Sequence, residues 1–520
     1  MRRFTFLTGL FGSLFLAATA QGIEPDNTVA PPQTVDAPVT GPLELSVEEA
    51  VALALQANPE LLAERQNPVI AGTFADVERA RFDPSVFASA SIGAEVSQQQ
   101  FANTNENLLI ERDTKSAAVG LRQYFPTGTD IELSVSQDKF ESNRAPTQAG
   151  ARVGLTLTQA LLRGAGIGTN LVALRQARTD VAASAYQLRG FVATLVAEVE
   201  RTYWRYLGAR ERIRILESSL ELAERQVEQA QQRIEAGTVA RTELAAVKAE
   251  VARRRQALID GRAEAARLKA SLLRQINPPG QQDGERDIRL ASEVEFTPGE
   301  DPVAAEHIDL ALARRPEINE ARLLLARNEL QVVATRNGLL PRLDLFVTLG
   351  QTGFADSFGE AYSQVDSGDT YDLSAALEFE YPLGNRAADA EDLRARREVV
   401  QAEASLANLG RLISAEVRNA VIEARRAAAQ IDATAATLAL QEETLEAEQA
   451  RFEVGRSTSL LVAQAQRDLL AAQLDRADAF LAYRQALIDL YRLDGSLLIR
   501  RLIDAPGEKP PDLPWLDSRF

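Results

Sequence analysis

The sequence contains no cysteine and only one histidine, His307, and these shortages exclude several kinds of site. Without cysteine the chain forms neither disulfides nor thiolate metal sites, and a single histidine rules out a histidine-rich metal site. No glycine-rich phosphate loop is present, and no carboxylate pair stands out among the 74 acidic residues. We therefore expect no enzyme activity, no metal and no cofactor, and we expect His307 to lie on a helix surface.

Long apolar runs are equally scarce, because nothing after the first twenty residues reaches the roughly 18 consecutive apolar residues of a membrane-spanning helix. Residues 1–20 themselves have the pattern of a secretory signal peptide: Arg2 and Arg3 precede an apolar segment, and 18–20 fit the small-residue cleavage pattern. Loss of the two arginines takes the net charge from −17 to −19, so nucleic acid is not an expected partner. We expect the mature chain to begin near Gln21 and to leave the cytoplasm.

What the sequence does contain is a long internal repeat. Two prolines recur 257 residues later, whereas a glycine further along recurs 218 residues later, so the first copy holds 39 extra residues. A repeat of about 200 residues is too long for a small solenoid unit, and it predicts two tandem structural repeats that fold against each other. The matched pairs are Pro59 with Pro316, Pro84 with Pro341, and Gly237 with Gly455.

Apolar and polar residues alternate after Pro84 and again after Pro341, which predicts β-strands with one apolar face. The first copy has strands within about 85–160, including an extra hairpin around a Pro/Gly turn that accounts for the additional residues. The second copy has strands within about 342–382. We count four strands in the first copy and two in the second.

Long segments with a heptad pattern flank the strands. Apolar residues between Leu216 and Ile234 step alternately by 4 and 3, with a later interruption at Arg254, and this period is typical of a coiled coil. A helix of about 67 residues is on the order of 100 Å long, which matches a return helix and a strand-proximal helix stacked end to end. The predicted long helices span about 168–236, 241–275, 386–454 and 458–494.

Proline-rich stretches bracket two structured units. They predict an N-terminal linker at 21–44, a first helix-strand-hairpin repeat at 45–276, a linker between the repeats at 277–305, a second repeat at 306–495 and a C-terminal tail at 496–520. Further motifs are LSVEEA at 45–50, ALQANPEL at 54–61, QALLRGAG at 159–166 and the glycine turns that close the long helices. Together with the repeat, the strands and the long helices, these motifs resemble the TolC-type outer-membrane efflux protein family.

The resemblance implies an α+β membrane protein built from three chains. They would form a transmembrane β-barrel of about 12 strands, about four from each chain, continuous with a long periplasmic α-helical coiled-coil barrel. The extra hairpin departs from this plan. We expect it to lie outside the barrel as a loop; the alternative is a larger barrel.

By resemblance, the chain is an exit duct in the outer membrane of a Gram-negative bacterium, with its helical tunnel in the periplasm. It would passively conduct substrates out of a tripartite efflux or type I secretion system. The implied partners are two further copies in a homotrimer, a periplasmic adaptor (membrane fusion) protein, an inner-membrane transporter and outer-membrane lipid. The alternative is a periplasmic adaptor, which would have one hairpin between soluble β-domains, or a structural coiled-coil protein of the envelope, which would lack alternating strands.

The resemblance also gives roles to the glycine turns. Adaptors are expected to dock there, at the tips of the helical hairpins, although glycine marks a helix reversal in any hairpin. The matching positions are Ala236, Gly237, Thr238, Val454, Gly455 and Arg456. Acidic residues and ion pairs just past the turns are expected to close a periplasmic gate. The gate candidates are Glu243, Arg456 and Gln464, and Gln464 stands where the family typically has an acid.

Overall fold

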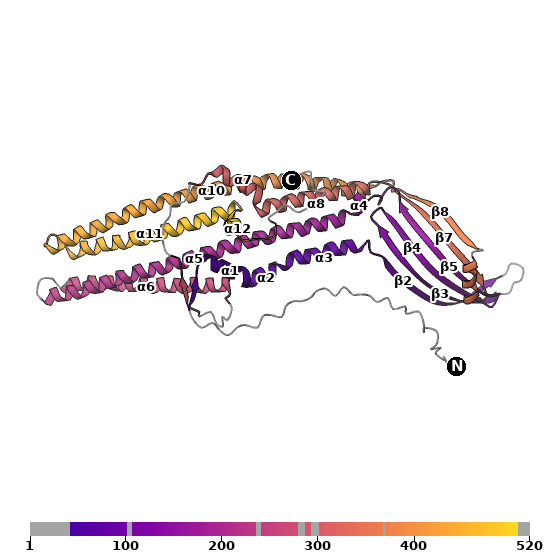
Figure 1. The fold of residues 1–520 in the computed structure, drawn as a ribbon, viewed down its shortest axis with the longest axis horizontal. Coiled ribbons are helices and arrows are strands. Elements are labelled where there is room, and N and C mark those ends of the chain that lie inside the picture. The colour runs from indigo at the N-terminus through magenta and orange to yellow at the C-terminus, as the bar shows by residue number, and fades with distance from the viewer. Residues whose placement is uncertain are drawn as a thin grey trace, which may run out of the picture.

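The computed structural model describes residues 42–100, 107–235, 241–278, 286–292, 301–367 and 370–507. The predicted signal peptide and most of the first linker lie outside these residues. The described chain is elongated, with a curved β-sheet at one end and paired helices that extend to the other (Figure 1). The predicted α+β class is confirmed.

The main sheet of the described residues has six antiparallel strands in the order β2-β3-β4-β5-β7-β8. The chain reverses direction at each step, so the two edge strands, β2 and β8, run in opposite directions. The strands are β2 (Ser85–Gln100), β3 (Asn107–Phe125), β4 (Thr129–Ser142), β5 (Ala145–Ala160), β7 (Arg342–Ala355) and β8 (Tyr371–Glu380).

The sheet corrects the expectation that the extra hairpin forms a loop. That hairpin is β3 and β4, and it lies within the sheet, where β3 pairs with β2 and β4 pairs with β5. It is therefore not a loop outside the sheet, and the six strands confirm the count of four in the first copy and two in the second. The physical reason is that both strands continue the apolar and polar faces of their neighbours. When β3 and β4 lie between β2 and β5, their backbone groups are hydrogen-bonded, and the sheet keeps one apolar and one polar face.

Two long helical hairpins form the other end of the molecule. Helix α5 (Val172–Glu235) returns as α6 (Arg241–Ile276), and α10 (Arg386–Glu453) returns as α11 (Ser459–Leu493). The hairpins lie side by side because α5 also packs against α11 (Figure 1). The contact is close at Gly208 of α5, where an added Cβ would lie 2.2 Å from a methyl carbon of Leu481.

Shorter helices complete the second arm of each hairpin towards the sheet. Helix α3 continues along α5, and α8 packs against both α5 and α10. Local signals explain where these helices begin: Ser46 and Glu49 form a capping box, and Asn58 caps the helix that follows. The shorter helices are α1 (Val47–Ala57), α2 (Pro59–Glu64), α3 (Gln66–Ala80), α4 (Ile167–Asn170), α7 (Ala304–Arg314), α8 (Pro316–Gly338), α9 (Phe358–Ser367) and α12 (Leu497–Arg500).

The largest apolar core lies at the waist of the molecule, where α1, α5, α6 and α12 meet. A small parallel sheet of β1 (Leu43–Leu45) and β6 (Ile288–Leu290) closes it, and the hydroxyl of buried Tyr203 lies 3.0 Å from the Leu45 carbonyl oxygen. His307 is not on a helix surface as expected. Its Nδ1 lies 2.6 Å from Oδ2 of buried Asp494, the residue that caps the end of α11.

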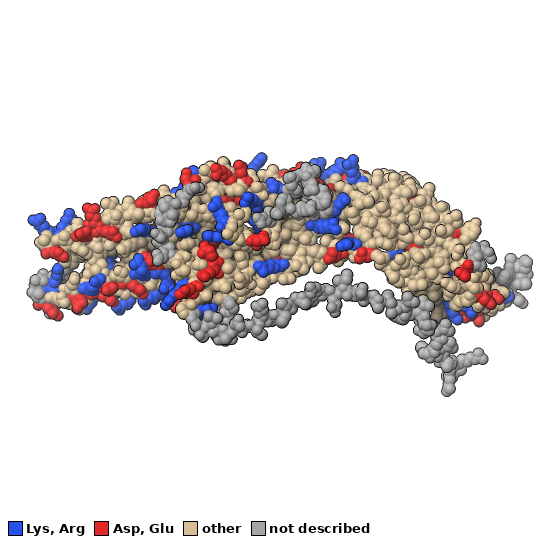
Figure 2. All heavy atoms as spheres, viewed as in Figure 1, with Lys and Arg blue, Asp and Glu red and all other residues tan. Residues whose placement is uncertain are grey.

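Charged residues are spread over the helical part and are scarce on the visible face of the sheet between its ends (Figure 2). In the part of the chain that the structure describes, no helix is both long enough and apolar enough to cross a bilayer.

Candidate functional site

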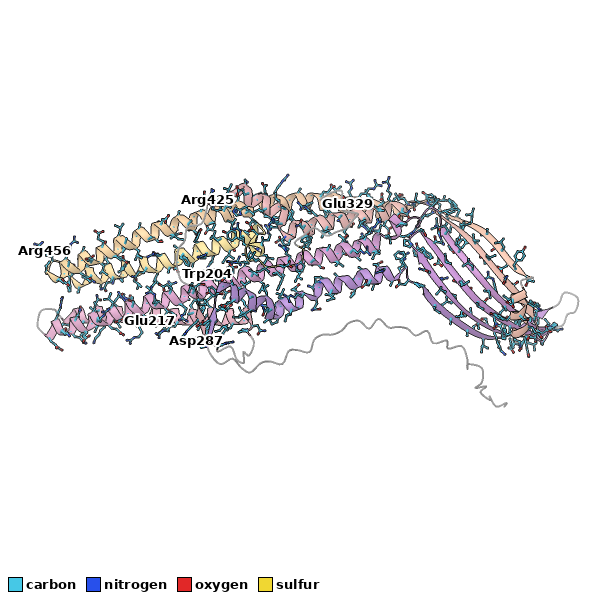
Figure 3. The ribbon with its side chains drawn as sticks, in the orientation of Figure 1. Trp204, Glu217, Asp287, Glu329, Arg425 and Arg456 are labelled. Atoms are coloured by element: carbon cyan, nitrogen blue, oxygen red, sulfur yellow. The ribbon has the colours of Figure 1, made fainter. Side chains whose placement is uncertain are left out.

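Helices α10 and α11 meet in a tight turn at the far end of the molecule, which Arg456 marks in Figure 3. Gly455 has φ = +72°, a left-handed conformation that favours glycine. The N–H groups of Gly455 and Arg456 donate to the carbonyl oxygens of Phe452 and Arg451 at 3.1 and 2.8 Å, which satisfies the end of α10. Val454 beside them is 70% exposed, so the turn presents an apolar side chain to solvent.

The other predicted site residues are placed less completely. Ala236, Gly237 and Thr238 lie outside the described residues, and only the helical backbone of Glu243 is described. Gln464 is exposed on α11, and no hydrogen bond or ion pair among the described residues joins it to Arg456.

A groove of about 980 Å³ lies between the two hairpins towards their tips. All four long helices line it, so the hairpins touch at the waist and leave a space between them nearer the tips. The residues that line it include Arg233 of α5, Glu250 of α6, Phe452 of α10, and Gln466 and Arg467 of α11.

A buried carboxylate joins three helices along this groove. Glu250 is 6% exposed and accepts hydrogen bonds from Arg253 Nη2 at 2.8 Å and Arg254 Nε at 3.1 Å. Arg254 also donates to the carbonyl and hydroxyl oxygens of Ser219 on α5, both at 2.7 Å. From the second hairpin, Arg467 Nη1 approaches Glu250 Oε2 to 3.7 Å. The cluster therefore ties the first hairpin together and bridges it to the second.

Burial by itself raises the pKa of Glu250, but the hydrogen bonds from Arg254 and Arg253 outweigh it and hold that pKa below its usual value. The carboxylate is therefore charged at neutral pH and compensates the charge of Arg254, which is also buried. Removing one member of such a buried pair destabilises a protein by about 3–5 kcal/mol, because the other charge is left without compensation.

A second contact spans the groove between the hairpins. The Arg233 guanidinium carbon lies 4.5 Å from the centre of the Phe452 ring, which is a cation–π geometry. Gln466 is 3% exposed, and neither of its side-chain amide atoms has a hydrogen-bond partner among the described residues. The sequence did not single out these groove residues as a site. Arg254 alone gave a local signal, since it interrupts the apolar heptad at a position that faces the partner helix.

The sheet has one apolar face and one polar face. A single register line on the apolar face joins large aliphatic residues across all six strands, and their side chains are largely uncovered, with Val86 76% and Leu373 66% exposed. Such a surface suits lipid rather than water. The residues on this line are Val86, Leu121, Leu133, Leu155, Leu349 and Leu373.

The apolar residues form a belt that crosses the strands diagonally. On β2 the belt extends from Val86 away from the helices to Val96, whereas on β8 it extends from Leu373 towards the helices to Phe379. Because Val86 and Leu373 share a register line, the belt centre shifts by about eight residues across the sheet. At about 3.3 Å per residue and about 4.8 Å per strand, this shift corresponds to a strand tilt of about 48°. Strands of membrane barrels tilt by a similar amount, roughly 35–45°.

The polar face contains an ion pair that joins β5 to β8 across β7. Arg152 Nε and Nη2 donate to Asp372 Oδ1 and Oδ2 at 3.1 and 3.0 Å. The guanidinium lies over Gly154 and Gly350, where an added Cβ would come within 2.2 and 3.0 Å of it. Glycine at these positions therefore lets a long side chain lie flat on the sheet.

Helix α9 covers the apolar face near the strand ends that are far from the long helices. Ala361 and Val365 of α9 are buried against Ala149 and Ala151 of β5. Beneath the helix, an added Cβ at Gly353 would lie 1.8 Å from the Ala361 carbonyl oxygen. The seating of α9 thus depends on the missing side chain of Gly353.

Comparison with known proteins agrees with this geometry. A sequence profile of the outer membrane efflux protein family matches residues 50–277 and 307–496. The pyoverdine export outer membrane protein OpmQ of Pseudomonas aeruginosa is 29% identical over 342 residues, which cover 63% of this chain and 67% of OpmQ.

Solved structures share the fold. The outer-membrane channel OprN superposes with a TM-score of 0.65 at 20% identity, over 86% of this chain and 90% of OprN. The outer membrane protein VceC of Vibrio cholerae superposes with a TM-score of 0.64 at 16% identity, over 86% of this chain and 96% of VceC. Members of the matched family are outer-membrane channel proteins and not enzymes, as predicted. Since the family profile matches most of its length, the chain belongs to the outer membrane efflux protein family and is an efflux duct of the outer membrane.

Proposed function

We propose that three copies of this chain form one channel. The sheets close a barrel across the outer membrane, and the two helical hairpins of each chain build a tunnel in the periplasm. The observation that supports this most is the tilted, exposed apolar belt on a sheet with two open edges, β2 and β8. In lipid each unpaired backbone group costs several kcal/mol, so such a sheet is stable only when it closes. One chain has too few strands for a water-filled pore, whereas a trimer supplies enough.

Within this channel, residues 45–276 and 306–495 act as tandem repeats that each contribute one hairpin to the tunnel wall. Substrates arrive from an inner-membrane transporter through a periplasmic adaptor and leave passively. The adaptor docks on the hairpin tips, and the exposed Val454 beside the tight Gly455 turn supports this placement. The proposed docking positions are Ala236, Gly237, Thr238, Val454, Gly455 and Arg456.

The groove contacts are the proposed closure of the periplasmic end. The pairs Glu250–Arg467 and Arg233–Phe452 hold the two hairpins of one chain together near the tips. Parting the hairpins would widen the tunnel mouth, and this requires both contacts to break. Glu243, Arg456 and Gln464 remain candidates for additional closing contacts between neighbouring copies at the tips.

Purification and electrical recording test the channel itself. The protein should be extracted from membranes only with detergent, have the mass of a trimer by light scattering, and conduct ions in planar bilayers. A water-soluble monomer that conducts no ions would overturn the proposal.

A further inference from the structure

The position of the β3–β4 hairpin determines the size of the outlet. Its side chains Leu121 and Leu133 continue the apolar line from β2 to β5. On the opposite face, β3 and β4 present small polar residues such as Ser116, Ser134 and Ser136. The hairpin thus has the same two faces as the four strands around it, and it is shaped as a part of the wall.

Strand number and direction allow all six strands to remain in the wall. The chain runs away from the helices along β2 and returns along β8, so β8 of one copy meets β2 of the next in antiparallel orientation, like every other pair of the sheet. When the apolar belts of the two edge strands are set at the same height, Ala376 of β8 lies near Ser91 of β2. Each of these residues is level with the centre of its belt and lies on the polar face. Both residues are small enough for close pairing.

We propose that each chain gives all six strands to the barrel, so that the trimer closes 18 strands and its outlet suits bulky hydrophilic solutes that a 12-stranded outlet would exclude. This inference rests on the trimeric channel proposed above. With about 4.8 Å between strands and a tilt of about 45°, 18 strands give a backbone diameter of about 39 Å and 12 strands about 26 Å. The polar face of the sheet lines this outlet with serine, threonine and glycine, which suits hydrated solutes.

A shortened variant measures the width of the outlet. Replacing residues 97–144 by Asn-Gly removes β3, β4 and the register shift between β4 and β5 near Ser142, and leaves a two-residue hairpin turn. In the resulting register Val86 faces Leu155, so both faces are preserved. Neutral polymers of graded size are added to the side of a planar bilayer that corresponds to the cell exterior, where they enter the barrel without passing the helical tunnel. We expect the largest polymer that lowers the conductance to have about 1.5 times the radius in the full chain.

If the full chain and the shortened variant both conduct as trimers and the same polymer is the largest that lowers the conductance of each, the wide outlet is wrong. The proposed channel function would not be affected by that result. A full chain that forms no channels at all would instead contradict the proposed function.

Single cysteines in the full chain give a second measurement that does not depend on the shortened variant folding. The native sequence has no cysteine, so each introduced thiol is unique. Ser136→Cys lies on the polar face of β4, and its neighbour Val135→Cys lies on the apolar face. A bulky charged thiol reagent should react with the first and lower the conductance, and should leave the second unchanged. Equal reaction at both positions without a change in conductance would show that the hairpin lies outside the wall.

Discussion

At the residue scale, Glu250 is the centre of the proposed closure between the two hairpins. Glu250→Gln removes the charge that compensates buried Arg254, which should destabilise the first hairpin by about 3–5 kcal/mol, and it also removes the attraction to Arg467 of the second hairpin. We expect the resting conductance of the trimer in planar bilayers to rise. The matched control is Glu224→Gln, which breaks an exposed ion pair with Arg255 in the first hairpin and should change stability by under about 1 kcal/mol. Equal conductance in both variants would remove Glu250 from the closure.

Acid should reproduce the effect of this substitution. The pKa of Glu250 in the folded protein lies below its ordinary value of 4.5, so its stabilisation is fully present above pH 4.5 and is lost as the pH falls through the lowered pKa. The charged groups that face it are Arg253, Arg254 and Arg467. Conductance recorded against pH should therefore rise only below pH 4.5 in the native protein. Glu250→Gln should show no such step, whereas Glu224→Gln should retain it.

Gly455 tests adaptor docking at the tip. Valine at φ = +72° is strained by about 1–2 kcal/mol or more, so Gly455→Val should reshape the turn without touching the rest of the protein. Export should be lost while the trimer persists in detergent. Gly455→Asn should retain export, since asparagine tolerates the left-handed conformation. Normal export by the valine variant would mean that the adaptor does not bind at this turn.

At the scale of whole elements, periodicity is a local property, and it indicated the long helices and the alternating strands directly from the sequence. It did not reveal that β3 and β4 belong to the sheet, because alternation fixes two faces of a strand and not its neighbours. The Glu250 cluster was not predicted for a similar reason, because Ser219 and Arg467 belong to other helices that are distant in the sequence. His307 was misplaced because its partner, Asp494, is 187 residues away.

Helix α9 gives a prediction at the same scale. Gly353→Ala should lift α9 from the apolar face, because the new Cβ would overlap the Ala361 carbonyl oxygen. Limited proteolysis of intact cells should then cleave near α9, while the conductance remains normal. Gly359→Ala is the matched control, since no atom lies within 4 Å of its added Cβ. If both variants resist the protease equally, the strand shifts at Gly353 to accommodate the new Cβ and α9 keeps its position on the sheet.

At the scale of the whole molecule, charge on the polar face of the described strands is unbalanced. Acidic residues outnumber arginines by eight to four on that face. The acids are Glu95, Asp130, Glu132, Asp138, Asp344, Asp372, Glu378 and Glu380, and the arginines are Arg112, Arg122, Arg152 and Arg342. In the proposed trimer this face surrounds the lumen, where its negative charge would concentrate cations.

Reversal potentials in a salt gradient should therefore show a preference for cations, and the preference should weaken at high ionic strength through screening. Glu378→Gln removes three lumen carboxylates from a trimer and should shift the reversal potential towards zero. Glu111→Gln removes the same charge from the opposite face of the sheet and should not. An identical shift in both variants would contradict the assignment of faces.

The unpaired edges of β2 and β8 also have a consequence for how such a channel is made. The apolar core between α1, α5, α6 and α12 is built from residues of a single chain. The sheet, in contrast, has two edges with unpaired backbone groups and an exposed apolar face. Folding of the sheet, insertion into lipid and association with other copies must then occur as one concerted event. A subunit that misses its partners is an aggregation hazard, so we expect surplus chains to be degraded rather than stored.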